Sequence, residues 1–466
     1  MRPLPRLVLA GLGAALLLST GTGGRAQGPP SQLPSQPELE QDPWALPAPG
    51  SCLEAGADPG AAPHTVDGLP LPFEPGDVIR VDRLDLLRPF IPVEIWAQRE
   101  RLFWEGMRLE IGPCYADYSP PGFFADTTRH FAGQARLIPG DAEQDGGLMN
   151  HTAGLPFPPA EIAADDPRAG ARWAWNFVHR YRGAGAFQSR FRAAHLASLR
   201  EESIHYYGDR FQALLTGRAD RPQDGYRHPG KKDLSFVSGG RFEKPADAHG
   251  VAWRLYRQRE AERDARLQDD VFRYEPGLRR VRRSPDLPYW NHIPFAGDQI
   301  RPNQLHWRVL GTRDLLAIAN AREPLFPETE DRDYGPWGLS FASDRWELRR
   351  ALVLEGTPRE EASISRRILY LDLQTLALLY KADYDANDEP THPAYHVLRW
   401  SEDRPDHPRG PDDPERPVRA LIPIAHVTFT EHGGCRIEAG STVATPPPDR
   451  KLDRLLSASR LQREAR

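Results

Sequence analysis

The segment from Asp383 to Asn387 has the acidic spacing with which a calcium-binding loop begins. Such a loop needs a glycine at its sixth position and a bidentate glutamate at its twelfth. Asp388 occupies the sixth position and Ala394 the twelfth. The segment is therefore interpreted as a turn between two strands, a place where Asp and Asn are favoured.

The histidines do not have the spacing of a zinc site. No His-Glu-x-x-His segment is present, and Pro393 lies between His392 and His396, where it argues against a regular helix. The chain also lacks the Gly-x-Ser-x-Gly segment of many hydrolases and the glycine-rich loops that bind phosphates. We therefore expect no catalytic residue, no metal and no cofactor, and a protein that is not an enzyme. An unrecognised enzyme would need polar residues that converge in a cavity.

The most concentrated charge is a run of four arginines around Val281. These are Arg279, Arg280, Arg282 and Arg283. They can lie on the solvated face and edge of a strand, where charge discourages pairing with another sheet. The functional alternative is a contact with an anion, such as a lipid headgroup or an acidic partner.

Seven apolar residues are candidates for lining an elongated, hydrophobic ligand pocket. Four have helical spacing within 167–182, and three lie in predicted strands that would form the opposing wall. The candidates are Ala174, Phe177, Val178, Tyr181, Trp253, Leu255 and Trp307. The sequence does not separate a filled core from a cavity.

The elements that must position these residues change in kind along the chain. Helices are predicted over 92–106 and over 167–182, where Asp166 can cap the helix and Pro167 suits its first position. Period-two alternation then predicts strands over 251–257, 271–283, 305–310, 346–355, 364–372 and 376–384. A hairpin over 419–445 and a tail helix over 450–466 are further candidates. Early helices and many closely spaced strands favour an α+β fold with a curved antiparallel sheet and helices on one face.

The first 26 residues have the features of a secretory signal peptide. Arg2 and Arg6 precede an apolar stretch over 7–18, which is shorter than the roughly 20 residues that span a bilayer. Small residues then stand at Gly24 and Ala26, which predicts cleavage after Ala26 and a periplasmic protein.

Charge and cysteine content limit the remaining possibilities. A net charge of −5 does not indicate a nucleic-acid partner. The three cysteines, Cys52, Cys114 and Cys435, could form one disulfide in an oxidising compartment and leave one thiol, but their pairing stays open.

Several short motifs, in one order, resemble those of the bacterial domain-of-unknown-function family 1329, whose members are described as similar to outer-membrane lipoprotein-sorting proteins. The matching segments are 153–158, 175–176, 180–183, 272–283, 307–311, 345–347, 355–357 and 365–372. The resemblance covers roughly residues 75–400, and the chain departs from the family pattern after Tyr384.

This resemblance implies a half-barrel sheet with helices against its concave face, as in periplasmic lipoprotein carriers. It implies a binding or carrier protein for a hydrophobic molecule or lipid, working with a resistance-nodulation-division transporter of the inner membrane and an outer-membrane protein. The alternative is a structural docking subunit of such a complex that holds no ligand. The expected organisation is a signal peptide (1–26), a linker rich in Pro, Gly and Ala (27–70), the carrier-like domain (71–400) and a Pro-rich C-terminal extension (401–466).

Overall fold

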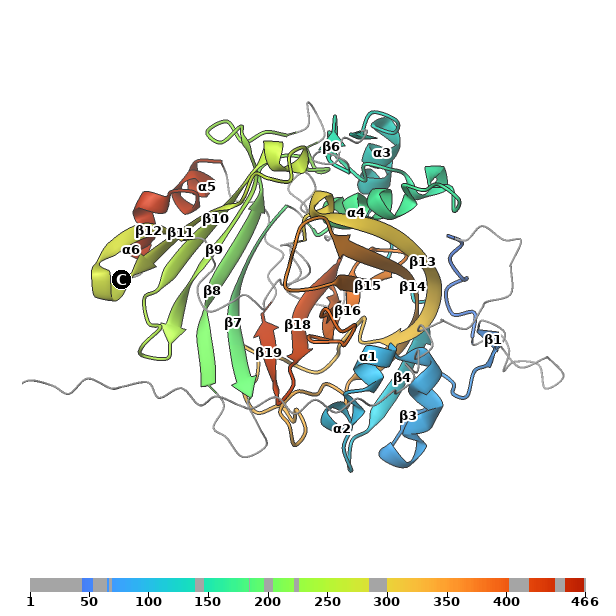
Figure 1. Ribbon diagram of the computed structural model, residues 1–466. Coiled ribbons are helices and arrows are strands. Elements are labelled where there is room, and N and C mark those ends of the chain that lie inside the picture. Colours follow the sequence, from blue (N-terminus) through green and yellow to red (C-terminus); the bar gives the residue numbers. More distant parts are fainter. Residues whose placement is uncertain are drawn as a thin grey trace, which may run out of the picture. The chain divides into compact units, whose positions relative to one another are not determined.

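A long run of strands dominates the computed structural model of the chain (Figure 1). The structure describes residues 44–52, 65–66, 69–138, 146–183, 185–196, 204–221, 226–284, 300–401, 419–440 and 449–464. The expected signal peptide, and most of the expected linker, lie outside these residues. All described residues belong to one unit, Gln41–Arg466.

Within the described residues, fifteen strands form one mixed sheet, in the order β12-β11-β10-β9-β8-β7-β19-β18-β17-β16-β15-β14-β4-β3, with β13 paired to β14. Their bounds are β3 Val78–Ile79, β4 Leu109–Cys114, β7 Ala186–Leu196, β8 Ile204–Leu214, β9 Leu234–Lys244, β10 Ala252–Gln258, β11 Asp270–Glu275, β12 Arg280–Ser284, β13 Leu305–Ala317, β14 Arg345–Pro358, β15 Arg366–Asp372, β16 Leu378–Tyr384, β17 Ala394–Trp400, β18 Leu421–Phe429 and β19 Gly434–Ala439. Two short pairs stand apart, β1 Thr65–Val66 with β2 Leu69–Pro70, and β5 Arg136–Leu137 with β6 Leu148–Met149. The predicted α+β class with a curved sheet is confirmed, although β4 pairs with β14 in parallel.

The helices are short. The α-helices are α1 Val93–Trp96, α2 Arg99–Leu102, α3 Gly122–His130, α4 Ala169–His179, α5 Asp449–Leu455 and α6 Leu461–Glu464. The 3-10 turns are η2 Val81–Phe90, η3 Pro159–Glu161, η4 Arg259–Glu262, η5 Pro276–Leu278, η7 Pro302–Gln304 and η9 Ala458–Arg460. The prediction of a single helix over 92–106 is wrong. The backbone of Gln98 (φ −96°, ψ 9°) departs from helical geometry and separates α1 from α2.

Both faces of the sheet are covered where β13 to β16 run. On one face, Ile368 and Tyr370 join a core with the N-terminal segment around α1 and α2. On the other, Leu369 and Leu371 join a second core with α4. Alternate residues of β15 thus enter different cores, as expected for a strand that is covered on both sides.

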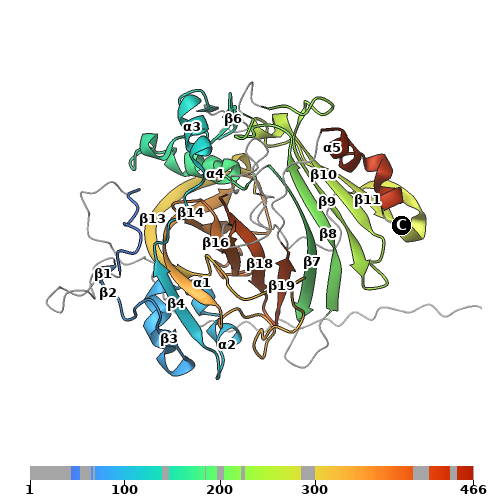
Figure 2. The ribbon, with the colours of Figure 1, turned by 180° about the vertical axis from the view of Figure 1, so that it is seen from behind.

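The strands β7–β12, here called the wing, form one end of the sheet (Figure 1). Helices α5 and α6 lie against the outer face of the wing (Figures 1 and 2). Ala252 and Tyr256 of β10 pack there against residues of these helices. Because side chains alternate along a strand, Trp253 and Leu255 belong to the opposite, inner face. Their cross-strand partners, Gly240 and Ser238 of β9, lie on that face too.

The hairpin β18–β19 lies in the middle of the sheet and joins its two halves. It occupies the segment in which a hairpin was expected over 419–445. On one side β18 pairs with β17, and on the other β19 pairs with β7. Residues beyond 400 therefore contribute two central strands to the same sheet as residues 71–400.

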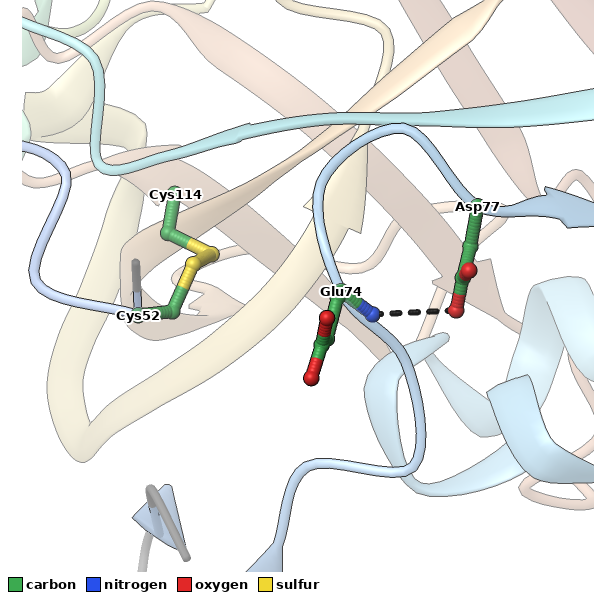
Figure 3. Close-up of a disulfide and its surroundings, with 4 residues drawn as sticks. All are labelled: Cys52, Glu74, Asp77 and Cys114. Carbon is green, nitrogen blue, oxygen red and sulfur yellow. Dashed lines mark hydrogen bonds between the residues drawn. A yellow bond between two sulfur atoms is a disulfide. The ribbon is translucent and has the colours of Figure 1, made fainter. Parts of the chain in front are cut away.

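A disulfide joins the first described segment to the sheet (Figure 3). Cys52 is bonded to Cys114 at the end of β4, and Cys435 is free and buried. Nearby, the backbone N–H of Glu74 donates to the Asp77 carboxylate at 3.1 Å and fixes the turn that leads into β3. The cysteine pairing that the sequence left open is thereby settled.

Candidate functional site

A cavity of about 60 Å³ lies between α4 and the inner face of the wing. One water needs roughly 10–15 Å³ by this kind of measure, so the cavity has room for a few water-sized groups. Its lining residues are Trp175, Val178, His179, Arg180, Arg182, Leu214, Thr216, Gly217, Ser235, Phe236, Arg257, Ala261, Glu262, Ile300, Arg301, Pro302 and Asn303. They come from α4, β8, β9, β10, η4, η7 and the residues next to these elements, segments far apart in the sequence.

Helix α4 is held in place by close packing and by specific hydrogen bonds. The Asn176 side chain both accepts from and donates to the backbone of Phe157, at 3.0 and 2.6 Å. The Trp175 indole donates to the carbonyl of Gly146 at 2.7 Å. At Gly170 the helix lies directly on β13, since a Cβ there would be 2.4 Å from the Trp307 carbonyl oxygen. These contacts fix the wall of the cavity that α4 supplies.

The cavity has an apolar floor. Leu214 and Phe236 line it from β8 and β9. They form one hydrophobic cluster with Leu255 and Val271 on the two strands that follow. The apolar surface therefore continues from the cavity along the inner face of the wing.

The opposite side of the cavity is polar and comes from η4 and η7. Arg301 is 6% exposed as a residue, and its guanidinium donates to the carbonyls of Ala261 at 3.0 Å and Asp264 at 3.2 Å, and also to that of Leu267. Asn303 donates to the Ala261 carbonyl at 2.8 Å. Both side chains are thus anchored on the loop that carries η4.

A titratable pair bridges α4 and η4. His179 Nε2 lies 3.8 Å from Glu262 Oε1. Burial, and then the neighbouring His151, lower the pKa of His179 well below its usual range. Burial raises the pKa of Glu262 to about 7, against the opposing effect of Arg259 and Arg257. Near neutral pH the contact therefore joins a neutral imidazole to a carboxyl group that is partly protonated.

The seven predicted ligand residues are divided among several places. Ala174, Phe177 and Trp307 are buried together in the core beneath α4. Val178 packs at the margin of that core and lines the cavity. These four residues are thereby brought together at one face of α4.

The other three predicted ligand residues lie elsewhere. Tyr181 stacks edge-on against Phe123 of α3, with ring centroids 5.7 Å apart. Trp253 packs on Phe242 at 5.2 Å, and Leu255 contacts the cavity floor through the cluster that contains Phe236. Of these three residues, only Leu255 belongs to a hydrophobic cluster that includes residues lining the cavity.

The arginine run lies on the last strand of the sheet, apart from the residues that line the cavity. Arg282 binds Glu275 at 2.6 Å, and Arg283 binds Asp270. All four arginines are exposed, and Arg279 sits at the end of the turn η5 with a positive φ of 50°. This placement matches the solvated-edge interpretation, and the ion pairs neutralise part of the charge.

Sequence reasoning missed the polar residues of the cavity. His179, Glu262, Arg301 and Asn303 belong to no motif, and their proximity depends on how η4 and η7 pack against α4. The apolar pattern over 167–182 indicated the helix that forms one wall of the cavity. The spacing of the polar residues did not indicate which residues form the opposite wall.

The turn interpretation of 383–387 agrees with the structure. Asp385 accepts from the backbone of Asn387 at 2.8 Å, and Asp383 is bound to Lys381 and Arg367. Within the residues that the structure describes, no three His, Cys, Asp or Glu side chains are grouped so that they could hold a metal ion.

Among the described residues, no helix has both the length and the apolar character that crossing a membrane requires.

Comparison with known proteins gives a family match over most of the chain. The family model described as "Protein of unknown function (DUF1329)" matches residues 100–406. A search of curated proteins finds no match.

Three solved structures match part of this chain. A domain described as an outer membrane lipoprotein-sorting protein, from Vibrio parahaemolyticus, is 13% identical (TM-score 0.37; 59% of this chain and 92% of that chain). A DUF1329 family protein from Desulfovibrio piger is 14% identical (TM-score 0.36; 59% and 92%). A LolA superfamily protein from Nitrosomonas europaea is 11% identical (TM-score 0.32; 58% and 90%).

Proposed function

The chain belongs to the DUF1329 family of proteins of unknown function, and from that premise we propose that it is a binding or carrier protein for a hydrophobic molecule or lipid, acting without covalent chemistry. The observation that carries the proposal is the cavity beside α4. Its floor is apolar at Leu214 and Phe236, and its opposite side is polar at Arg301 and Asn303. An amphiphilic molecule needs both kinds of surface, an apolar wall and a few placed polar groups.

The small volume of the cavity limits which part of such a ligand it can hold. With about 60 Å³, the cavity takes one end of the molecule. The rest lies along the apolar stripe of Phe236, Leu255 and Val271, each of which is less than a tenth exposed. Ligand entry therefore displaces the groups that cover this stripe, and each buried CH₂ of the ligand returns about 0.8 kcal/mol.

The proposed place of action is the periplasm. The Cys52–Cys114 disulfide supports this, because disulfides persist in oxidising compartments. In the proposal, residues 1–26 are removed after Ala26, and the protein passes its ligand between a resistance-nodulation-division transporter and an outer-membrane partner. Detection of a mature chain that begins at Gln27 in the periplasmic fraction would test the export step.

Binding of the neutral fluorescent probe Nile red to the folded protein tests the carrier proposal. We expect saturable binding, and a loss of about tenfold or more in affinity for Val178→Trp, because the larger side chain fills the cavity beside α4. Val93→Trp is the matched control, since Val93 is 68% exposed and remote from the cavity lining. Equal affinity in both variants would argue against the cavity as the binding site.

The alternative is a docking subunit without a ligand, and the packing beneath α4 favours it. Trp173, Ala174 and Phe177 are fully buried in a filled core. A docking subunit would bind partners through its exterior and would show no saturable uptake of Nile red. Mass spectrometry of an organic extract of the purified protein would give an independent answer.

A further inference from the structure

We propose that the cavity beside α4 receives the carboxylate end of an amphiphilic ligand and that Arg301 is the cation that holds it. The inference rests on the proposed carrier function and names the class of ligand. Three observations carry it: the state of Arg301, the unpartnered polar atoms around it, and the charge of the lining residues.

Arg301 is a buried cation with bonding capacity to spare. No carboxylate lies within 4.0 Å of it among the residues that the structure describes. Three of its five N–H groups donate to backbone carbonyls, which leaves two. A guanidinium that is desolvated in this way binds a carboxylate more strongly than an exposed one does.

Two further polar atoms in the lining of the cavity have no partner. His179 Nε2 and Asn303 Oδ1 are both buried and accept or donate no hydrogen bond. A ligand carboxylate can accept a hydrogen bond from Nε2–H of the neutral His179 imidazole. A water molecule bound to the ligand can donate a hydrogen bond to Asn303 Oδ1. Buried polar groups are normally satisfied, so these two atoms indicate a polar occupant of the cavity.

The charge of the lining favours an anion over a neutral polar group. Four arginines line the cavity, Arg180, Arg182, Arg257 and Arg301, against one carboxylic acid, Glu262. Arg257 is neutralised by Asp269 at 2.8 Å. Among the lining residues, Glu262 is the group that opposes an incoming anion, and its protonation removes that repulsion. The carboxylates of Asp264 and Asp269 also act on Arg301, but they are paired with Arg266 and Arg257.

Three ligands with the same twelve-carbon chain test the inference: dodecanoate, below its critical micelle concentration, and dodecanol and methyl dodecanoate, each below its solubility limit. We expect calorimetry or displacement of Nile red to show that dodecanoate binds about tenfold or more tightly than the two neutral ligands. Arg301→Gln should abolish this preference while the affinity for dodecanol stays within about twofold of the parent.

His179→Phe provides a second variant, since phenylalanine keeps a ring against Trp175, and His179 Nε2, which the change removes, has no hydrogen-bond partner. It should reduce the preference for dodecanoate and leave the melting temperature unchanged, so it tests the site even if Arg301→Gln does not fold. Arg283→Gln, in the exposed arginine run, is the control and should keep the full preference.

The outcomes separate this inference from the function on which it rests. If none of the three ligands and no neutral probe binds, the carrier function falls and the inference with it. If all three bind equally, the carrier function stands and the carboxylate inference is overturned. A preference lost in Arg283→Gln and retained in Arg301→Gln and His179→Phe would place the anion at the edge of the sheet and would also overturn it.

Discussion

At the scale of single residues, the polar side of the cavity makes the protein sensitive to pH near neutrality. Glu262 has a pKa of about 7 because it is buried, whereas an exposed glutamate titrates near 4.5. The folded protein therefore holds a proton that the unfolded chain has lost between these two values. Stability that is present below pH 4.5 is lost as the pH rises through 7.

Glu262→Gln removes this titration. Relative to the parent, the variant should gain stability as the pH rises from about 4.5 to 7, by up to about 3 kcal/mol if the full pKa difference is realised. Urea unfolding at several pH values measures the difference. His151 and His179 have lowered pKa values and shift parental stability in the opposite direction, but their contribution is common to both proteins. A constant difference between pH 5 and pH 8 would contradict the raised pKa of Glu262.

The polar residues of the cavity also show where sequence reasoning stops. Ala174, Phe177 and Val178 share a helical stripe, and a stripe of this kind predicts which side of a helix packs. Arg301 and Asn303 follow no repeating pattern, and their role depends on carbonyls of Ala261 and Asp264, which lie 37 to 42 residues away in the sequence. Such a contact comes from tertiary packing, for which the spacing of residues gives no signal.

At the scale of elements, the strands that were predicted and those that were missed differ in composition. Over 364–384, apolar residues fill both faces, and the strands β15 and β16 match the prediction within a few residues. The strands β7, β8 and β9 were not predicted. They carry arginines and the glycines Gly208 and Gly240, and Gly240 leaves room for the Trp253 ring, 2.4 Å from where its Cβ would stand. Polar and glycine residues inside long strands weaken the alternation on which the prediction depends.

The β15–β16 hairpin should tolerate no charge on the face that packs under α4. Leu369 and Leu371 are both fully buried there. Leu369 stands opposite Lys381, which is held by Asp383, whereas Leu371 stands opposite Leu378. We expect both Leu369→Asp and Leu371→Asp to destabilise the protein, and Leu371→Asp by more, about 3–5 kcal/mol, because it has no cation beside it. A melting temperature equal to that of the parent would show that this face is open to water.

The approach of α4 to the sheet gives a second prediction at this scale. In Gly170→Ala, the new methyl group meets the Trp307 carbonyl oxygen at 2.4 Å, so helix and strand must separate. Backbone atoms yield less than side chains, and we expect a loss of about 1–3 kcal/mol in urea unfolding.

Gly122→Ala in α3 is the matched control, since its Cβ would meet no atom within 4 Å. It should be neutral or slightly stabilising, because alanine favours helix more than glycine does. If both variants unfold at the same urea concentration, α4 does not rest on β13 as closely as the structure has it.

At the scale of the whole molecule, the sheet depends on segments from both ends of the described chain. The N-terminal strand β4 pairs in parallel with the start of β14, while the late hairpin β18–β19 connects β17 to the wing. The family motifs lie between these two contributions. Here, segments from the C-terminal part of the chain form strands in the middle of the sheet. Local residue patterns do not predict this strand order, since each pattern indicates that a segment is a strand but not which strand it pairs with.

The Cys52–Cys114 disulfide closes a loop of about 60 residues at the N-terminal edge of this sheet. By the chain-entropy estimate, cross-linking a loop of that length stabilises the folded state by about 4 kcal/mol. We therefore expect the double variant Cys52→Ala, Cys114→Ala to lower the free energy of unfolding by about 2–4 kcal/mol. Because both sulfurs are buried, a reductant should act on the parent mainly after unfolding, so urea curves of the parent with and without reductant should differ by a similar amount.

Cys435→Ala separates the effect of the disulfide from that of removing thiols, because Cys435 is buried and free. Its small change in volume should cost much less than the loss of the cross-link, and its curve should still shift when reductant is added. If the double variant is as stable as the parent, the segment around Cys52 is held by its packing alone. In that case the bond contributes nothing to the sheet beyond what β4 already gains from its parallel pairing with β14.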